Sequence, residues 1–584
     1  MKLFNTAALV LLLAPIALGA GRTTVTSFKA TAGVDAARVV WEAQVPAGVA
    51  GWAIEWRCYS ELGGATTRSV KPNVRDYTIR GLKPGRVYAV RIYPYVTKDK
   101  TIARAPVSGQ TRPLMVRVGR PADAAPAAPR GLRAAADDTR VRLTWAPSPE
   151  LHVAGYEILR KGPGDEKPAL HARINVAAYR PTLERPGGGN VRLAGPAVLI
   201  ESGLETDKEY AYSVRVFTAD TPPKYSAEAG PVTVRTKPYR VQSGDILFVV
   251  NTESKNAVKI ARTYARVRGV RNPRAVKIKV PAQAEISRDD YDRKLLAPVR
   301  AFLRKSPRTT IVILVRGVPW RIREDDKTAG PARYDHWTRA SVESDLALAR
   351  FEDYPVQGRL RNPLYNKAAP LTPVDGILGV CRLDAPEDRV ANELVKKAVD
   401  AEKRGVNGIA FFDSGGPYHS GNRAIKSAAE MVRKDGRLQV KIDHDGPVID
   451  LSTLKDTIGY YYGWYGGHFQ PKNKRFRFGR GAVAVHLHSF AAYRVWSKTR
   501  HWVGPFLMHG ATATLGTADE PLLDGFPTAD ALTDALLKGC NFAEASLSAS
   551  RYLSWMSVNI GDPLYRPFKP QPNADLEKAL EEAL

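Results

Sequence analysis

The stretch DILFVVNTESKNAVKIARTYARVRGVRNPRAVKIKV, residues 245–280, decides the fold of the larger part of the chain. It opens with a continuous apolar run at 245–250, which is typical of a strand buried on both faces. Ser254 then precedes apolar residues at helical spacing, so we expect it to cap a helix, and AVKIKV at 275–280 predicts a second strand. A strand, a helix and a strand in this order predict a right-handed crossover within a parallel sheet.

The same alternation continues toward the C-terminus. Helical patterns separate further apolar runs, which are TTIVILV (309–315), GILGVCRLD (376–384), GIAFFD (408–413), TIGYYYGW (457–464), AVAVHLHS (482–489) and ATATLG (511–516). We therefore expect residues 244–568 to form one α/β domain with a mostly parallel sheet covered on both faces.

The N-terminal part has a different pattern, in which short β-type runs alternate with turn residues over 24–113 and again over 127–236. The two segments match position by position: Trp41 corresponds to Trp145, and Tyr88 and Tyr210 each lie six residues after a leucine. Such runs predict two all-β sandwiches. Both resemble fibronectin type III domains, with the two tyrosines in the tyrosine-corner position. The resemblance implies spacing or adhesion modules.

The chain ends and the net charge suggest where the protein acts. A charged start and a short apolar run over 1–20 are typical of a cleaved signal peptide, so we expect a secreted, periplasmic or cell-surface protein with no membrane span after cleavage. Pro and Ala predict a linker over 114–126, and 569–584 predict a tail helix. A net charge of +28 suits anionic polysaccharide or a protein at the cell envelope as partner, although an Arg-rich composition spread over all surfaces is the favoured explanation. No motif predicts specific nucleic-acid binding.

Polar side chains follow four of the predicted strands. Ligands bind at the carboxyl ends of parallel strands, so we take these positions as the candidate site. They are Arg316, Asp413, Trp464 and the group His486, His488 and Ser489. Strand alternation would place the two histidines on one face and the serine on the other.

Three chemistries could use this set. Ser489 could act as a nucleophile with His486, His488 or His468 as base, although no G-x-S-x-G turn is present. His486 and His488 could share a zinc ion, the one cofactor considered, although no H-E-x-x-H motif is present. Arg475 and Arg477, in the basic loop PKNKRFRFGR (471–480), could bind an anion, or this loop could simply be solvated surface.

The α/β segment resembles a family of uncharacterised exported bacterial proteins through VRGVPWRI, GYYYGWYGG, HLHSFAA and the closing SWMSVNIGDPLYRPF. More distantly it is similar to gingipain-type cysteine peptidases of the caspase-like fold. In that comparison Trp464 stands in place of the catalytic histidine, and His488 or Ser489 in place of the cysteine, while Cys381 and Cys540 lie elsewhere. The resemblance implies a caspase-like scaffold without the Cys–His dyad, hence a binding or envelope-associated role. The alternative is a peptidase- or esterase-like hydrolase that uses Ser489 and the nearby histidines, with or without a metal.

Overall fold

The structure is a computed structural model that describes residues 23–568. It leaves out short internal segments at 34, 59–64, 99–100, 106, 110–113, 119–124, 149–152, 176–181, 185–189, 193–196, 221, 240, 324–338 and 352–358. The predicted signal peptide and tail helix lie outside the described residues. The chain divides into two compact units, Met1–Thr182 with Gly187–Lys237, and Leu183–Pro186 with Pro238–Leu584. Among the described residues, no helix is both long and apolar enough to cross a membrane.

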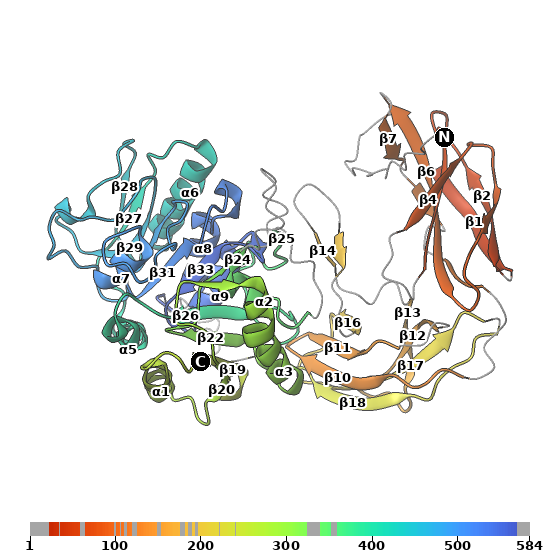
Figure 1. The fold of residues 1–584 in the computed structure, drawn as a ribbon, viewed down its shortest axis with the longest axis horizontal. Coiled ribbons are helices and arrows are strands. Elements are labelled where there is room, and N and C mark those ends of the chain that lie inside the picture. Colours follow the sequence, from red (N-terminus) through yellow and green to blue (C-terminus); the bar gives the residue numbers. More distant parts are fainter. Residues whose placement is uncertain are drawn as a thin grey trace, which may run out of the picture. The chain divides into compact units, whose positions relative to one another are not determined.

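The first unit contains two β-sandwiches with the same strand order (Figure 1). In the first, the sheet β5-β2-β1-β8 faces the sheet β4-β3-β6-β7, with β9 also paired to β6. The strands are β1 (Thr23–Ala32), β2 (Ala36–Gln44), β3 (Gly51–Cys58), β4 (Thr66–Val70), β5 (Asp76–Arg80), β6 (Val87–Lys98), β7 (Thr101–Arg104), β8 (Val107–Gly109) and β9 (Leu114–Arg117). Trp41 and Trp52, one from each sheet, pack edge to face with ring centroids 5.8 Å apart.

The second sandwich repeats this plan. Its sheets are β10-β11-β16 and β13-β12-β17-β18. Their strands are β10 (Arg130–Ala136), β11 (Arg140–Ala146), β12 (Val153–Lys161), β13 (Ala169–Asn175), β16 (Ala197–Ser202), β17 (Glu209–Thr218) and β18 (Ala229–Arg235), and a small hairpin pairs β14 (Thr182–Glu184) with β15 (Asn190–Arg192). Trp145 packs against Tyr156 as Trp41 does against Trp52 in the first copy.

The two predicted tyrosine corners are present. The hydroxyl of Tyr88 accepts a hydrogen bond from the backbone N–H of Lys83 at 2.9 Å, and that of Tyr210 accepts one from Glu205 at 3.2 Å. The structure differs at the linker, because β9 (Leu114–Arg117) pairs with β6 and so belongs to the first sandwich. Leu114 and Val116 pack on that core, which the Pro/Ala composition of the following residues concealed.

The second unit is built on a ten-stranded mixed sheet (Figure 1). Its order is β20 (Arg274–Ile278), β19 (Ile246–Asn251), β22 (Ile311–Val315), β26 (Gly379–Leu383), β33 (Ser557–Ile560), β31 (Ala513–Thr517), β30 (Val483–His486), β29 (Ile458–Gly463), β27 (Ile409–Asp413) and β28 (Val440–Asp443). Strands β20 to β26 pair in parallel, and so do β31 to β28. The apolar runs read from the sequence therefore form the strands of this sheet.

Helix α5 (Asp388–Arg404) shows that both parallel runs point the same way. Its first residue, Asp388, pairs with Arg316, which follows β22, while Arg480, just before β30, donates to the carbonyl groups of Arg404 and Gly405 at its end. The helix thus starts at the carboxyl edge of the first run and ends at the amino edge of the second, as a crossover between parallel strands requires. Strand β33, between the runs, pairs antiparallel with β31 and meets β26 through one parallel-type pair. The two ends of α5, at opposite edges of the sheet, fix the relative direction of the two runs.

The remaining elements connect or cover the sheet. The helices are α1 (Ala257–Arg268), α2 (Arg288–Asp290), the π-helix η2 (Tyr291–Leu296), α3 (Ala297–Lys305), α4 (Val342–Leu346), α6 (His419–Asp435), α7 (Val503–Met508), α8 (Ala529–Leu537) and α9 (Phe542–Ala549), with short 3-10 turns η1 (Ser243–Asp245), η4 (Leu451–Thr453) and η5 (Leu523–Gly525). Short strand groups are β21 (Glu285–Ser287) with β23 (Arg321–Arg323) and β24 (Ala340–Ser341), and β25 (Leu360–Arg361) with β32 (Tyr552–Leu553). Helix α1 begins at Ala257 with Asn256 as N-cap, so Ser254 is not the cap that the sequence suggested.

Alternate residues of β29 show which helices cover which face. The hydroxyls of Tyr460 and Tyr462 reach Thr533 on α8 and the carbonyl of Pro527. Tyr461, on the opposite face, packs edge to face against Phe506 of α7. Helices α6 and α8 therefore lie on one side of the strand ends described below, and α7 on the other.

A buried carboxylate joins the end of the last strand to helices α1 and α5. Asp562, which is fully buried, accepts hydrogen bonds from the Tyr264 hydroxyl at 2.8 Å and from the Arg268 guanidinium at 2.5 Å. The same Arg268 pairs with Glu402 near the end of α5 at 2.6 Å. The motif residue Asp562 thus connects the end of β33 to α1 and α5.

We predict that Asp562→Asn destabilises the α/β domain by about 3 kcal/mol or more, because removing one partner leaves part of a buried charge uncompensated. Urea unfolding followed by tryptophan fluorescence measures the loss. Asp534→Asn is the matched control, since it breaks the surface pair with Lys538 and should cost less than about 0.5 kcal/mol. Equal losses in the two variants would contradict the role given to Asp562.

Candidate functional site

The candidate residues of the last strands lie at one edge of the sheet. Strands β27, β29 and β30 are neighbours, with Phe412 opposite Tyr462 and Gly463 opposite His486. Asp413, Trp464 and His486 therefore occupy adjacent strand ends, as the carboxyl-end rule predicts. Their side chains, however, do not converge on a common catalytic centre.

His486 is part of the core. It is fully buried, its ring stacks on Trp502 with centroids 3.3 Å apart, and its Nδ1 shares a 2.8 Å hydrogen bond with the Tyr461 hydroxyl. Burial, together with the nearby His488, lowers its pKa well below the usual value, so the ring is neutral. Its Nε2 has no hydrogen-bond partner among the described residues. A histidine held in this way supports packing and is not accessible as a base.

Asp413 is a second buried polar group in this row. Its side chain is fully buried, one oxygen accepts a long 3.4 Å bond from the N–H of Gly415, and the other has no partner among the described residues. Burial raises its pKa to about 7, with a further contribution from Asp443 on the neighbouring strand. The carboxyl group is therefore half-protonated near neutral pH.

Trp464 faces inward and is 1% exposed. Its ring lies against Gly416 and Gly421, where an added Cβ would come within 2.0 and 2.4 Å of the ring. Its Nε1 donates to Asn422 Oδ1 at 2.6 Å. Trp464 thus secures the start of α6 to the sheet.

The end of β30 turns before Ser489. The strand stops at His486, so simple alternation no longer applies, and Ser489 Oγ donates to Glu520 Oε1 at 2.9 Å. Glu520 also accepts from the N–H of Leu522 at 2.9 Å. His488 packs near the ring of Tyr465, 5.0 Å between centroids, and burial lowers its pKa. The described hydrogen bonds of the Ser489 hydroxyl include none to a histidine side chain.

His468 lies in an open cleft of about 640 Å³ at the same sheet edge. Its Nδ1 accepts from the N–H of His501 at 2.9 Å, and the two rings are 5.1 Å apart. The cleft is also lined by a mixture of cationic, aromatic and acidic side chains, namely Arg339, Phe490, Tyr493, Arg494, Arg500 and Asp519. Sequence reasoning missed these residues, although YRVWSKTRHW (493–502) alternates basic and aromatic residues much as the loop at 471–480 does.

The electrostatics of the cleft are cationic. Its one carboxylate, Asp519, is already paired with Arg339 at 3.0 Å. Arg494 and Arg500 are exposed and form no ion pair among the described residues. Burial, together with the neighbouring histidines and these two arginines, lowers the pKa of His501 to about 4.

Two residues of the cleft have strained backbone. Phe490 has φ of 65° and His501 has φ of 58°, which is the left-handed region that residues with bulky side chains rarely adopt. Each such residue costs about 1 to 3 kcal/mol, and strain of this kind gathers at ligand sites. The geometry therefore fixes an aromatic ring and an imidazole at the rim of the cleft.

The other predicted binding residues lie elsewhere. Arg316 pairs with Asp384 and Asp388 and covers the ring of Trp496, 5.0 Å away, so it ties together loops at the carboxyl edge. Arg475 and Arg477 are exposed, and Arg477 donates to carbonyl groups of its own loop. None of the three lines the cleft.

The α/β domain contains two free cysteines, Cys381 and Cys540. Cys381 and Cys540 are buried, and burial raises the pKa of Cys381 well above its usual value and that of Cys540 to about 12. Protonated, inaccessible thiols are inert. The described residues include no group of three or more histidine, cysteine or acidic side chains that could hold a metal ion.

Comparison with known proteins gives limited results. No protein-family model matches the chain, and no curated protein does. Among solved structures, the two-fibronectin-type-III segment of chicken tenascin matches at 11% identity and a TM-score of 0.15, covering 36% of this chain and 99% of that one. The FN1–FN3 domains of chicken CNTN1 match at 14% identity and a TM-score of 0.16, and the match covers 37% of this chain and 68% of that one. The strand order and tyrosine corners described above define the two sandwiches independently of these likenesses.

We predict that Asp413 makes the domain less stable as the pH rises. The unfolded chain releases this proton near pH 3.8 and the folded chain near 7, so the folded state is favoured below about 4 and loses stability as the pH rises through 7. Asp413→Asn should therefore gain about 2 to 4 kcal/mol over the wild type between pH 4 and pH 8, measured by urea unfolding. The exposed Asp445→Asn should show no such gain. A pH-independent difference for Asp413→Asn would show the assignment to be wrong.

We predict losses of stability of different size for the two residues of the suggested Ser–His pair. His486→Ala removes a ring stacked in the core and should cost about 3 kcal/mol, whereas Ser489→Ala loses one half-buried hydrogen bond and should cost about 1 kcal/mol. Thermal unfolding of both variants is the measurement. If His486→Ala keeps the wild-type midpoint, the histidine is not structural and its part in catalysis must be reconsidered.

Proposed function

We propose that the protein is an exported modular binding protein whose α/β domain captures an acidic ligand in the cleft of His468, Arg494, Arg500 and His501. The observation that carries the proposal is the cleft itself. It is an open volume of about 640 Å³ in which the only carboxylate is paired and two arginines are not, among the described residues. Guanidinium groups beside aromatic rings suit acidic sugars, because rings stack on Phe490 or Tyr493 while cations hold the acidic groups.

The ligand that fits these features best is an anionic polysaccharide at or outside the cell envelope. Exported sandwich modules of the fibronectin type III kind suit such a setting. We further propose that the α/β domain has a caspase/gingipain-like scaffold that lacks the Cys–His dyad. In support, GWYGG and HLHSF follow the neighbouring strands β29 and β30, where Trp464 and His486 are both built into the core.

The hydrolase alternative has weaker support. The Ser–His arrangement needs a histidine within hydrogen-bond reach of the serine hydroxyl, and Ser489 Oγ donates to the carboxylate of Glu520 instead. His486, the histidine of the adjacent strand end, is occupied by Tyr461 and Trp502. A binding function requires neither group to be activated.

The test compares two pairs of arginines. Arg494→Gln with Arg500→Gln should weaken binding to a sulfated or uronic-acid oligosaccharide at least tenfold, measured by isothermal titration calorimetry at two salt concentrations. Arg475→Gln with Arg477→Gln removes the same charge from the loop at 471–480 and should change affinity less than twofold. Equal losses in both double variants would mean that general surface charge, not the cleft, binds the oligosaccharide.

A further inference from the structure

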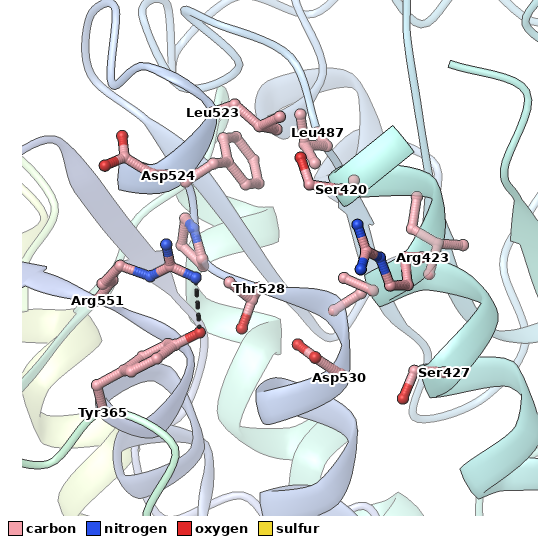
Figure 2. A pocket seen from close by; sticks show the side chains of 16 residues that line it. Tyr365, Ser420, Arg423, Ser427, Leu487, Leu523, Asp524, Thr528, Asp530 and Arg551 are labelled. Atoms are coloured by element: carbon pink, nitrogen blue, oxygen red, sulfur yellow. Dashed lines mark hydrogen bonds between the residues drawn. The ribbon is translucent and has the colours of Figure 1, made fainter. Parts of the chain in front are cut away.

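A second pocket lies on the other side of the same strand end. Leu487 follows His486 directly and lines a hollow of about 550 Å³ formed by α6, η5 and the start of α8 (Figure 2). His486 instead packs on Trp502, next to α7. The two hollows share no lining residue, so this pocket is distinct from the cationic cleft.

Two guanidinium groups point into this pocket from opposite sides. Figure 2 shows Arg423, on α6, facing Arg551 across the hollow. Arg551 donates to the Tyr365 hydroxyl at 3.1 Å and lies over its ring at 5.1 Å, but this partner carries no charge. Arg423 forms no ion pair or side-chain hydrogen bond among the described residues. Neither cation therefore has a bonded carboxylate in the part of the chain that the structure describes.

The two acidic residues of the lining are already engaged. Asp524 pairs with Arg359 at 2.7 Å and accepts from the Tyr552 hydroxyl at 2.8 Å. Asp530 lies in the first turn of α8, where it accepts from the N–H of Ala531 at 2.9 Å and faces the positive end of the helix. Because Asp524 is paired with Arg359, Asp530 is the one lining carboxylate without a bonded cation among the described residues, against the two guanidinium groups, and the remaining charge of the lining is positive.

Further polar atoms in the pocket lack partners. The hydroxyl of Thr528 and the Nε of Arg551 are buried and form no hydrogen bond within the described residues. Buried polar groups are nearly always satisfied, so unsatisfied ones in a hollow mark a place for water or a ligand. The rest of the lining is largely apolar, with Leu487, Leu523 and Phe526 among the contributors.

We propose that this pocket binds an organic carboxylate with an apolar body of small-molecule size. The carboxylate would lie between Arg423 and Arg551, because guanidinium groups match carboxylates in charge and in geometry. The apolar body would cover Leu487, Leu523 and Phe526. A free organic acid and the C-terminal end of a short peptide both present this chemistry.

The experiment uses calorimetry on the full chain with three probes. N-acetyl-Leu-Leu acid and 4-phenylbutanoate represent the chain end and the free acid, and N-acetyl-Leu-Leu amide lacks the charge. At least one acid should bind with a Kd of about 1 mM or tighter, and the amide at least tenfold more weakly than its acid. Binding of the dipeptide acid alone would identify a chain end as the source, and binding of phenylbutanoate alone a free acid.

Variants locate the site. Arg423→Gln should weaken binding of the acid at least tenfold, and because Arg423 has no side-chain partner among the described residues, the thermal midpoint of the variant should stay near that of the wild type. Arg433→Gln, on the same helix but away from the pocket, and Arg494→Gln, in the cleft, should leave the affinity within twofold. Equal binding of acid and amide, an equal loss in Arg433→Gln, or no saturable binding of either acid up to about 10 mM would overturn the proposal.

Discussion

The α/β domain depends on the buried carboxylate of Asp562. Its two oxygens hold the hydroxyl of Tyr264 and the guanidinium of Arg268, and Arg268 extends the connection to Glu402. These contacts join residues 298 positions apart in the chain, so they hold the first crossover helix to the end of the last strand. A buried charge of this kind is retained only where geometry satisfies it fully, which makes the network a constraint on the whole sheet rather than a local addition.

The same principle explains the carboxyl edge of the sheet. Polar residues at the strand ends were natural candidates for chemistry, yet several of them serve to fix loops. Arg316 binds two acidic residues, Trp464 fills a glycine-lined space, and His486 stacks within an aromatic core. The accessible charge lies one step further out, in the loop between His488 and Trp502. The end of β30 is therefore held rigidly by the core, and the loop that follows it carries the cations of the cleft, Arg494 and Arg500.

Much of the architecture could be predicted from the sequence. Strands of a parallel sheet are buried on both faces, so they are recognisable as apolar runs of five or six residues wherever they occur. The repeat of Trp41 and Trp145 and of Tyr88 and Tyr210 likewise predicted two sandwiches. Strand β33 was not foreseen, since its four residues sit within a motif of mixed polarity and its pairing depends on distant partners. The site was harder still. Whether a histidine is buried or exposed depends on which helix covers it, and the aromatic ring that stacks on His486 comes from Trp502, which no local pattern connects to it.

Residues 486–488, at the end of β30, contact the core and line or adjoin both hollows. His486 is fixed on the side of α7, Leu487 lines the pocket beside α6, and His488 lies next to the cationic cleft. Ligands bound in the two hollows would therefore both lie next to this one short peptide segment. Thermodynamic linkage then imposes reciprocity: by whatever factor a guest on one side alters the affinity for a guest on the other, the reverse effect has the same size.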